Sequence, residues 1–213
     1  MIRLAISVEG PTEEEFSRNV LTTHLRSYGI EAQPVVLGRA RSRGAGGGNV
    51  SVGLLASEMA YLYGSFDAVT SLVDFYGFRD KRDKTAEELE ALVHGQVQQK
   101  IGWNKNRVLP YVQKHEFEGL LFSDAGAFSA LVDAPVESVD LLRNIRAGFA
   151  TPEDINDNKA TVPSRRIKEL IPHYRKPLHG PLVAIEIGLG AIRAECPRFN
   201  EWITNLESLR GRI

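Results

Sequence analysis

Apolar positions in the first part of the chain switch between short continuous runs and helical spacings. Residues 2–8 form a short apolar run that predicts a buried strand. A helix is expected over residues 12–27, because Thr12 and Glu15 form a capping box at its start, and residues 30–37 predict a second strand. Strand, helix and strand in this order are typical of the opening of an α/β domain.

The same alternation continues beyond a glycine-rich stretch. Helices are predicted over residues 52–63 and 85–102, and strands over residues 68–73 and 107–112. Residues 38–49 contain several glycines and three arginines, but their spacing matches neither of the common phosphate-binding patterns. We expect this stretch to be a mobile connection.

Beyond residue 125 the pattern is helical. Apolar residues recur at helical spacing, as at Ile185, Leu189 and Ile192, and we interpret these stripes as core positions. The predicted fold class is therefore α/β, a mostly parallel sheet flanked by helices with an appended C-terminal helical lobe. We expect an α/β core over residues 1–125 and a helical lobe over residues 126–213 packed on that core.

The composition supports a globular protein in a reducing compartment. The chain has 213 residues, 43% of them hydrophobic and 25% charged, which excludes intrinsic disorder. No run approaches the ~20 apolar residues of a membrane-spanning helix, and the start of the chain lacks the layout of a signal peptide. The single cysteine, Cys196, excludes an intrachain disulfide. We expect a cytoplasmic location and no membrane partner.

Acidic residues follow three of the predicted strands. Glu9 follows the first strand, Asp74 follows the third, and Glu116 and Glu118 follow the fourth. Ligands of open α/β sheets bind outside the carboxyl ends of the strands, so these acids are candidates for one site. Their oxygens suit Mg²⁺ or Mn²⁺. We therefore predict all four as metal ligands and catalytic residues, with caps or surface groups as the alternative for any one of them.

Phosphodiester cleavage is the chemistry that such a cluster serves best. Metals about 4 Å apart polarise the phosphoryl oxygen, activate water and offset charge on the leaving oxygen. Glu116 and Glu118 would point to one side if residues 114–119 were extended and could then bridge two metals. They would diverge in a helix, so the local conformation decides whether they act as a pair.

The charge distribution leaves room for a nucleic-acid partner. The net charge is only −1, from 26 basic and 27 acidic residues, which excludes a generally basic nucleic-acid binder. Basic residues are nevertheless clustered, and the residues selected as nucleic-acid contacts are Arg79, Lys84, Lys114, Arg165 and Lys168. Surface ion pairs are the alternative for each. His115 lies beside the predicted acid pair and has either a structural or a proton-transferring role.

Two groups of residues carry a resemblance to known proteins. The segment Val8–Glu13, with sequence VEGPTE, and the strand-end Asp74 resemble the Toprim domain of topoisomerases, primases and the nucleases of the overcoming-lysogenization-defect (OLD) type. Three further segments resemble a bacterial Toprim-like family of unknown function: His115–Phe122, Pro163–Ile167 and Cys196–Trp202.

This resemblance implies a function and marks one departure from the family pattern. It implies that Glu9 is the Toprim glutamate and that Asp74 is the first acid of an Asp-x-Asp motif, whereas Tyr76 stands at the second acid. Asp80 or Asp83 could supply the missing charge, or Glu116 and Glu118 could replace it.

The resemblance therefore implies a Mg²⁺- or Mn²⁺-dependent nuclease or phosphotransfer protein of phage-defence systems that acts with a partner ATPase. No Walker sequence occurs in these residues, so ATP would be used by that partner. The alternative is a non-catalytic module that binds nucleic acid or the ATPase.

Overall fold

The computed structural model describes residues 1–38, 50–102, 107–156 and 161–211, and the chain divides into two compact units. The sheet unit comprises Met1–Gln113 and Trp202–Ile213, and the helical unit comprises Lys114–Glu201. This division differs from the expected boundary at residue 125, because the chain leaves the sheet unit after Gln113 and its last segment belongs to that unit again. The predicted glycine-rich connection lies, from residue 39 to residue 49, outside the described residues.

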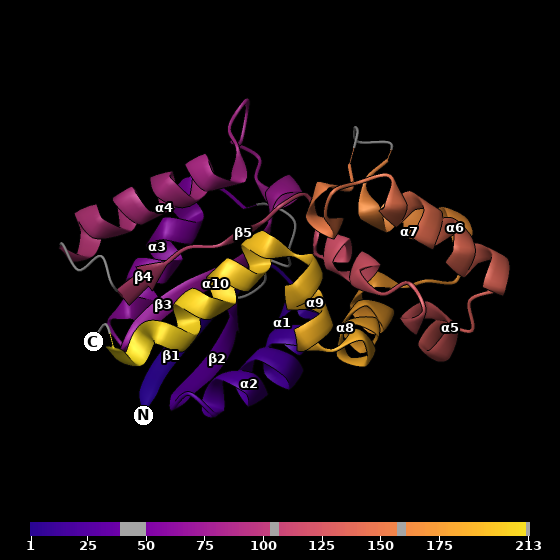
Figure 1. Cartoon of the computed structure of the whole chain (residues 1–213). Helices are drawn as coiled ribbons and strands as arrows, with labels where there is room; N and C mark the ends of the chain where they lie inside the picture. The colour runs from indigo at the N-terminus through magenta and orange to yellow at the C-terminus, as the bar shows by residue number, and fades with distance from the viewer. Residues whose placement is uncertain (39–49, 103–106, 157–160, 212–213) are drawn as a thin grey trace. The chain divides into compact units, whose positions relative to one another are not determined.

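The sheet unit is built on a parallel sheet, as Figure 1 shows. Its strands follow the order β2-β1-β3-β4, and a short fifth strand also pairs with β3. Their bounds are β1 (Ile2–Val8), β2 (Ile30–Val36), β3 (Ala68–Asp74), β4 (Val108–Leu109) and β5 (Val112–Gln113). All pairings between these strands are parallel, so the predicted mostly parallel sheet flanked by helices is confirmed.

Strand β2 tolerates a proline because it lies at the edge of the sheet. The Leu37 N–H donates to the Val8 carbonyl, so the odd-numbered residues of β2 direct their backbone groups toward β1. The even-numbered residues then point outward, where the Ala32 carbonyl accepts a hydrogen bond from the Thr22 hydroxyl. Pro34 is one of these outward positions, so its missing N–H removes no bond within the sheet.

The predicted strand over residues 107–112 is divided into β4 and β5 around Pro110. A side chain of β3 compensates for the interruption. The Ser71 hydroxyl donates to the Tyr111 carbonyl and accepts from the Tyr111 N–H, both at 2.9 Å. Both backbone groups are therefore satisfied although the ladder is broken there.

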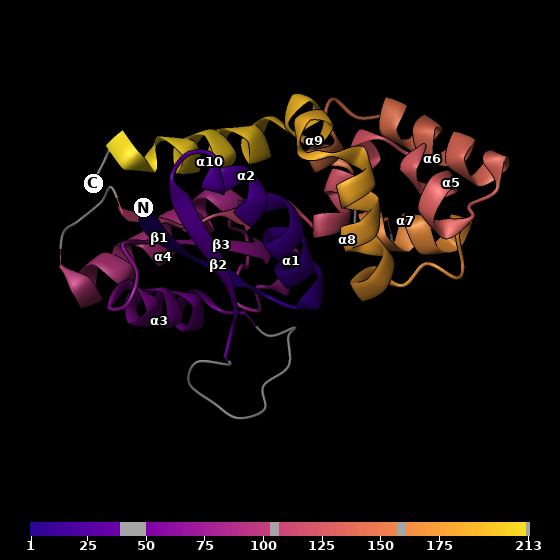
Figure 2. The same ribbon diagram turned by 90° about the horizontal axis from the view of Figure 1, so that it is seen from below.

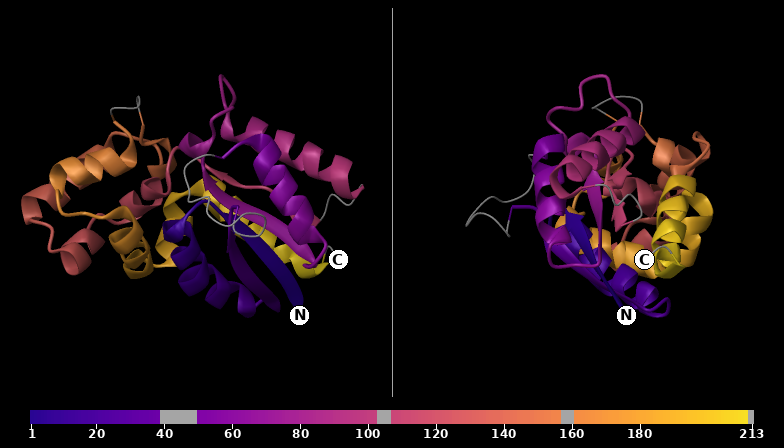
Figure 3. Two further views of the ribbon diagram at one scale, coloured as in Figure 1. Left: turned by 180° about the vertical axis from the view of Figure 1, so that it is seen from behind. Right: turned by 90° about the vertical axis from the view of Figure 1, so that its left-hand side faces the viewer.

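Helices cover both faces of the sheet (Figures 2 and 3). One face packs against α3 (Val52–Tyr63) and α4 (Ala86–Ile101), whose apolar side chains form one core cluster with alternate strand residues such as Ala5 and Val69. The other face carries three elements: α1 (Pro11–Phe16), α2 (Thr22–Arg26) and the part of α10 (Pro197–Glu207) from Trp202 onward. A π-helical segment, Ser17–Leu21, joins α1 to α2.

Two helix starts show how local sequence sets the boundaries. The Thr85 and Glu88 capping box of α4 is confirmed. Helix α1, however, begins at Pro11, and its reciprocal acid is Glu13, which accepts the Gly10 N–H at 3.0 Å. The predicted partnership of Thr12 with Glu15 is wrong, because proline occupies the first helical position and the capping pair lies two residues earlier, at Gly10 and Glu13.

Trp202 anchors the C-terminal segment to the sheet. Its indole N–H donates to the Thr70 hydroxyl at 2.8 Å, and its ring stacks on Tyr111 with a centroid distance of 4.5 Å. Both partners lie within the sheet unit, so this segment belongs to the same core as the strands although it is distant in sequence.

The helical unit is organised around a buried 3₁₀ segment, Phe117–Ser123. Its helices are α5 (Ala127–Val132), α6 (Val136–Ala147), α7 (Pro163–Leu170), α8 (Lys176–Ile187), α9 (Leu189–Glu195) and the first residues of α10. Among the described residues, no helix is long and apolar enough to cross a membrane.

One predicted core stripe is wrong in part. Gly188 has φ +81° and separates α8 from α9, so the helical spacing from Ile185 through Leu189 to Ile192 does not follow one helix. Ile192 is buried, but 42% of Ile185 is exposed. Glycine takes this left-handed backbone at no steric cost, and the helix direction changes there.

Candidate functional site

Glu9 and Asp74 are brought together by the parallel pairing of β1 and β3. Val8, the last residue of β1, pairs with Leu72, so Glu9 follows β1 beside the last residues of β3, which ends at Asp74. The Glu9 Oε2 atom accepts the backbone N–H of Asp74 at 3.3 Å, and Asp74 is only 7% exposed. The structure thus places two of the predicted acids at the carboxyl edge of the sheet.

Gly77 provides the space that the Glu9 carboxylate fills. It ends the 3₁₀ turn Phe75–Gly77 directly after β3. A methyl group at Gly77 would lie 2.8 Å from Cδ and from Oε1 of Glu9, and closer still to Oε2. Any side chain here would therefore displace the carboxylate. This glycine was not among the residues predicted from the sequence, although a glycine three residues after a strand-end acid is a usable signal.

Lys81 adds a fixed positive charge beside this turn. Its ammonium group donates to the Phe78 carbonyl at 3.0 Å and lies 5.7 Å and 5.4 Å from the ring centroids of Phe75 and Tyr76. These contacts hold the cation next to the turn that follows Asp74. Lys81 belongs to a basic cluster visible in the sequence, but only its ring and carbonyl contacts distinguish it from its neighbours.

Asp80 has a different role from the one considered for it. Both of its carboxylate oxygens accept the Val52 N–H, at 3.1 Å and 3.3 Å, at the start of α3. The negative charge therefore stabilises the amino end of that helix. Asp83 is exposed.

Glu116 and Glu118 belong to the helical unit, and each has its own structural partner there. The Glu116 carboxylate accepts the Ser164 N–H at 3.0 Å, in the first turn of α7. Glu118 is fully buried, and its Oε2 atom lies 2.8 Å from Nζ of Lys176 at the start of α8. Two successive helices of the unit are thus held to the 3₁₀ segment by these acids.

The conformation of residues 114–119 decides whether Glu116 and Glu118 point to the same side, which the sequence left open. Glu116 is extended, with φ −143° and ψ 155°, but the 3₁₀ helix begins at Phe117. The two carboxylates therefore reach α7 and α8 separately. Nearby, burial and the negative charge of Glu118 raise the pKa of the Tyr174 hydroxyl, which keeps this phenol neutral.

His115 combines a strained backbone with a neutral ring. It is one of the few non-glycine residues with positive φ, at +64°. Burial, together with the positive charge of Lys114, lowers its pKa to about 4, against the opposing effect of Asp154. The Nδ1 atom lies 3.5 Å from the Asn156 side-chain amide. His115 is therefore uncharged at neutral pH.

The lowered pKa of His115 predicts that the stability of the protein depends on pH. Between the ordinary pKa of 6.5 and the folded value of about 4, the unfolded chain binds a proton that the folded chain does not. Stability should therefore fall as the pH is lowered through this window. Asparagine tolerates positive φ, so His115→Asn should make the urea midpoint less sensitive to pH between 7 and 5. An unchanged pH dependence in the variant would contradict this assignment.

Two of the basic residues selected as phosphate contacts form ion pairs within the helical unit. Lys114 Nζ lies 2.5 Å from Asp154, and Arg165 lies 3.0 Å from Glu169 one turn further along α7. The Asp154 pKa is lowered because the hydrogen bonds of Lys114 and Thr151 outweigh the opposing effect of burial. The Arg79 and Lys168 side chains are exposed. The arginines of residues 39–43 lie outside the described residues.

The donor set at Glu9 and Asp74 fits a hard cation. Within the described ranges, no three or more His, Cys, Asp or Glu residues form a group that could hold a metal ion. Mg²⁺, however, is commonly held by one or two carboxylates together with waters and substrate phosphates. Glu9 and Asp74 offer carboxylate oxygens at one edge of the sheet, and they would hold Mg²⁺ or Mn²⁺ there if such an ion were bound.

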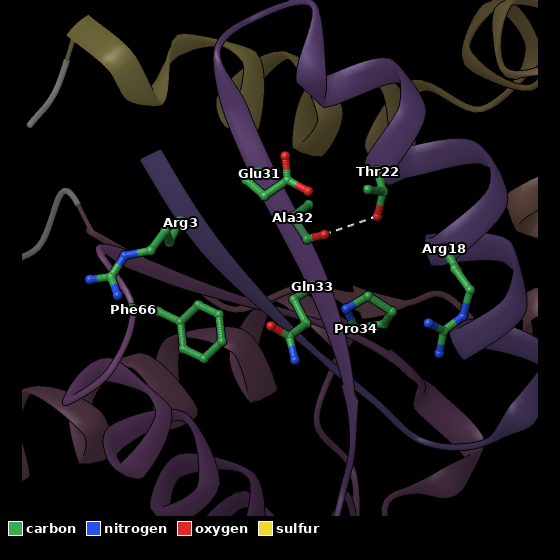
Figure 4. A pocket seen from close by; sticks show the side chains of 8 residues that line it. All are labelled: Arg3, Arg18, Thr22, Glu31, Ala32, Gln33, Pro34 and Phe66. Atoms are coloured by element: carbon green, nitrogen blue, oxygen red, sulfur yellow. Dashed lines mark hydrogen bonds between the residues drawn. The ribbon is translucent and has the colours of Figure 1, made fainter. Parts of the chain in front are cut away.

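A hollow of about 350 Å³ lies beside β2, away from these acids (Figure 4). It is near the amino ends of the strands, where Arg3 pairs with Glu31 in the sheet register. Its charged side chains have partners: Arg3 with Asp67, Arg18 with Glu14 and Glu31 with Arg26. The three charged side chains that line the hollow are therefore already paired with other residues of the protein.

Comparisons with known proteins place the chain in a family. No curated protein matches it. A solved structure described as the C-terminal region of the OLD protein of Xanthomonas campestris pv. campestris is similar, with a TM-score of 0.47 and 14% sequence identity, over 99% of this chain and 98% of that one. A family model described as "Domain of unknown function (DUF4276)" matches residues 8–207. The chain, whose strand-end acids and helical unit both fall within these limits, belongs to the DUF4276 family.

Proposed function

We propose that the protein is a Mg²⁺- or Mn²⁺-dependent nuclease that hydrolyses phosphodiester bonds. The observation that carries the proposal is the position of two acids, Glu9 and Asp74, at the carboxyl edge of a parallel sheet, where the Glu9 carboxylate accepts the backbone N–H of Asp74 and Gly77 leaves space for it. The resemblance of the segment around Glu9 to Toprim domains supports the same chemistry.

Each residue near the pair has a role in this proposal. A bound divalent cation would supply a polarised phosphoryl oxygen and a water of lowered pKa. Glu9 and Asp74 would hold that cation, and the backbone N–H of Asp74 keeps the Glu9 carboxylate oriented. The Lys81 ammonium would contact a phosphate oxygen of the substrate and offset its charge. Arg79 and Lys84 would bind flanking phosphates.

The experiment is a cleavage assay on supercoiled, linear and single-stranded DNA and on RNA, with Mg²⁺, Mn²⁺ or EDTA. We expect metal-dependent cleavage that falls at least about 100-fold in Glu9→Gln and in Asp74→Asn, because each removes a charged ligand. Glu15→Gln is the matched control, since this glutamate of α1 is exposed. Cleavage that persists in both site variants would exclude these residues as the catalytic centre.

A non-catalytic module that binds nucleic acid is the second candidate. Two observations favour it: Tyr76 stands where the resemblance implies a second acid, and the described residues hold no group of three metal-binding side chains. This candidate predicts no cleavage with any metal but binding that weakens steeply with salt. The same protein preparations, titrated with labelled DNA and RNA at several salt concentrations, distinguish the two functions.

The resemblance to OLD-type proteins also motivates a partner. We infer that any ATP dependence would come from a separate ATPase, because these 213 residues contain no Walker sequence. The same resemblance motivates a role in phage defence. Cleavage by the chain alone should then be independent of ATP.

A further inference from the structure

Helix α8 presents an apolar stripe to solvent. Leu178, Leu182 and Ile185 are 46%, 43% and 42% exposed. Their spacing of four and three residues places them on one side of the helix. The opposite side, with Val183, Ala184 and Ile187, is buried in the helical unit. The helix is therefore apolar on both sides, which a helix at the surface of a monomer does not require.

Opposite charges flank this stripe at its two ends. Arg175 precedes α8 and Glu186 lies in its last turn, and both are exposed. Arg175 is the N-cap residue and Glu186 lies eleven residues further on, so at about 100° per residue their Cα positions come to within roughly 20° of the same side of the helix. No ion pair joins either side chain to another of the described residues.

We propose that α8 is a self-association surface on which a second copy of the chain packs antiparallel about a two-fold axis. Such an axis makes the interface self-complementary. The leucines and Ile185 of the two copies then face one another across it. Because residues on the same flank meet in an antiparallel pair, Arg175 of each copy lies opposite Glu186 of the other.

The size of the stripe sets the strength of the pairing. Three partly exposed side chains from each copy bury less surface than the roughly 1,200–2,000 Å² of a standard stable interface. The dimer is therefore weak and concentration dependent. Its specificity comes from the two symmetry-related ion pairs more than from the apolar contact.

Sedimentation velocity over a wide concentration range tests the dimer directly. We expect a monomer–dimer equilibrium that Leu182→Glu abolishes, because it buries a charge at the centre of the apolar contact. Leu92→Glu is the control, since Leu92 is a comparably exposed apolar residue, at 40%, on α4 of the sheet unit. Circular dichroism of each variant confirms that the fold is kept. A wild-type chain that is monomeric at all concentrations, or a dimer indifferent to Leu182→Glu, overturns the proposal.

Charge reversal tests the antiparallel geometry. Arg175→Glu and Glu186→Arg should each weaken dimerisation about ten-fold, because each creates like-charge pairs, and the double variant should restore it. Failure of the double variant to restore dimerisation overturns the antiparallel pairing. Leu182→Cys should form a disulfide between copies on mild oxidation, and Cys196 is fully buried and does not compete. A monomeric chain that instead binds anionic lipid vesicles through the same leucines would also overturn the proposal.

Discussion

Gly77→Ala is expected to abolish metal-dependent cleavage while leaving the protein folded. The added methyl group would lie within 2.8 Å of the Glu9 carboxylate carbon, so the carboxylate must move. The end of a glutamate side chain moves at little cost, and Gly77 does not have the positive φ that would strain alanine. We therefore expect a change of less than about 1 kcal/mol in stability and a loss of at least about 100-fold in cleavage rate.

Two comparisons make this prediction specific. Gly53→Ala is the control, because a methyl group there meets nothing closer than 3.9 Å, and this variant should cleave normally. The double variant Glu9→Gln/Gly77→Ala should be no less active than either single variant, since both changes act on the same carboxylate. Losses that multiply in the double variant would show that Gly77 acts through something other than Glu9.

Lys176→Met is expected to destabilise the protein by roughly 3 kcal/mol. It leaves the fully buried Glu118 without the ammonium group that lies 2.8 Å from its carboxylate. Removing one partner of a buried ion pair typically costs about 3–5 kcal/mol, and the lower end applies because Lys176 is partly exposed. At this chain length, the loss corresponds to a decrease of about 6–12 °C in Tm. Thermal and urea unfolding followed by circular dichroism measure it.

The double variant Glu118→Gln/Lys176→Met separates the buried charge from the contact itself. It should recover part of the loss, because no unpaired charge is buried. Arg165→Met is the matched control, since its pair with Glu169 is exposed and should contribute at most about 1 kcal/mol. Cleavage by the Lys176→Met variant below its unfolding temperature should be normal if Glu118 is structural. A loss of cleavage without a loss of stability would restore Glu118 as a candidate catalytic residue.

The acids of the sheet unit could be predicted because neighbouring parallel strands end at one edge. Short, largely apolar segments identify β1 and β3 in the sequence, and the register between them brings Glu9 to Asp74. The Gly77 space was not predicted, since it depends on where the Glu9 side chain goes after the strand ends. Lys81 was visible only as one member of a charged cluster.

Glu116 and Glu118, the two acids of the helical unit, show what the spacing of residues along the sequence cannot predict. Two residues of separation were compatible with a bridging pair only in an extended segment. The segment changes from extended to 3₁₀ between Glu116 and Phe117, because the apolar residues from Phe117 to Phe122 are buried together in the core of that unit. Burial of this core also directs Glu118 to Lys176, which is distant in sequence.

The sequence by itself determined the alternation of strands and helices, the parallel sheet and the acids at its carboxyl edge. These features follow from local periodicity and from the helices that alternate with the strands, because parallel strands need such crossover connections. Only the tertiary structure decided that the last segment joins the sheet unit through Trp202 and that Glu118 is paired with Lys176. The tertiary structure also decided that the apolar stripe of α8 lies at the surface. Such contacts join residues far apart in the chain, and their energies depend on burial, which no local pattern records.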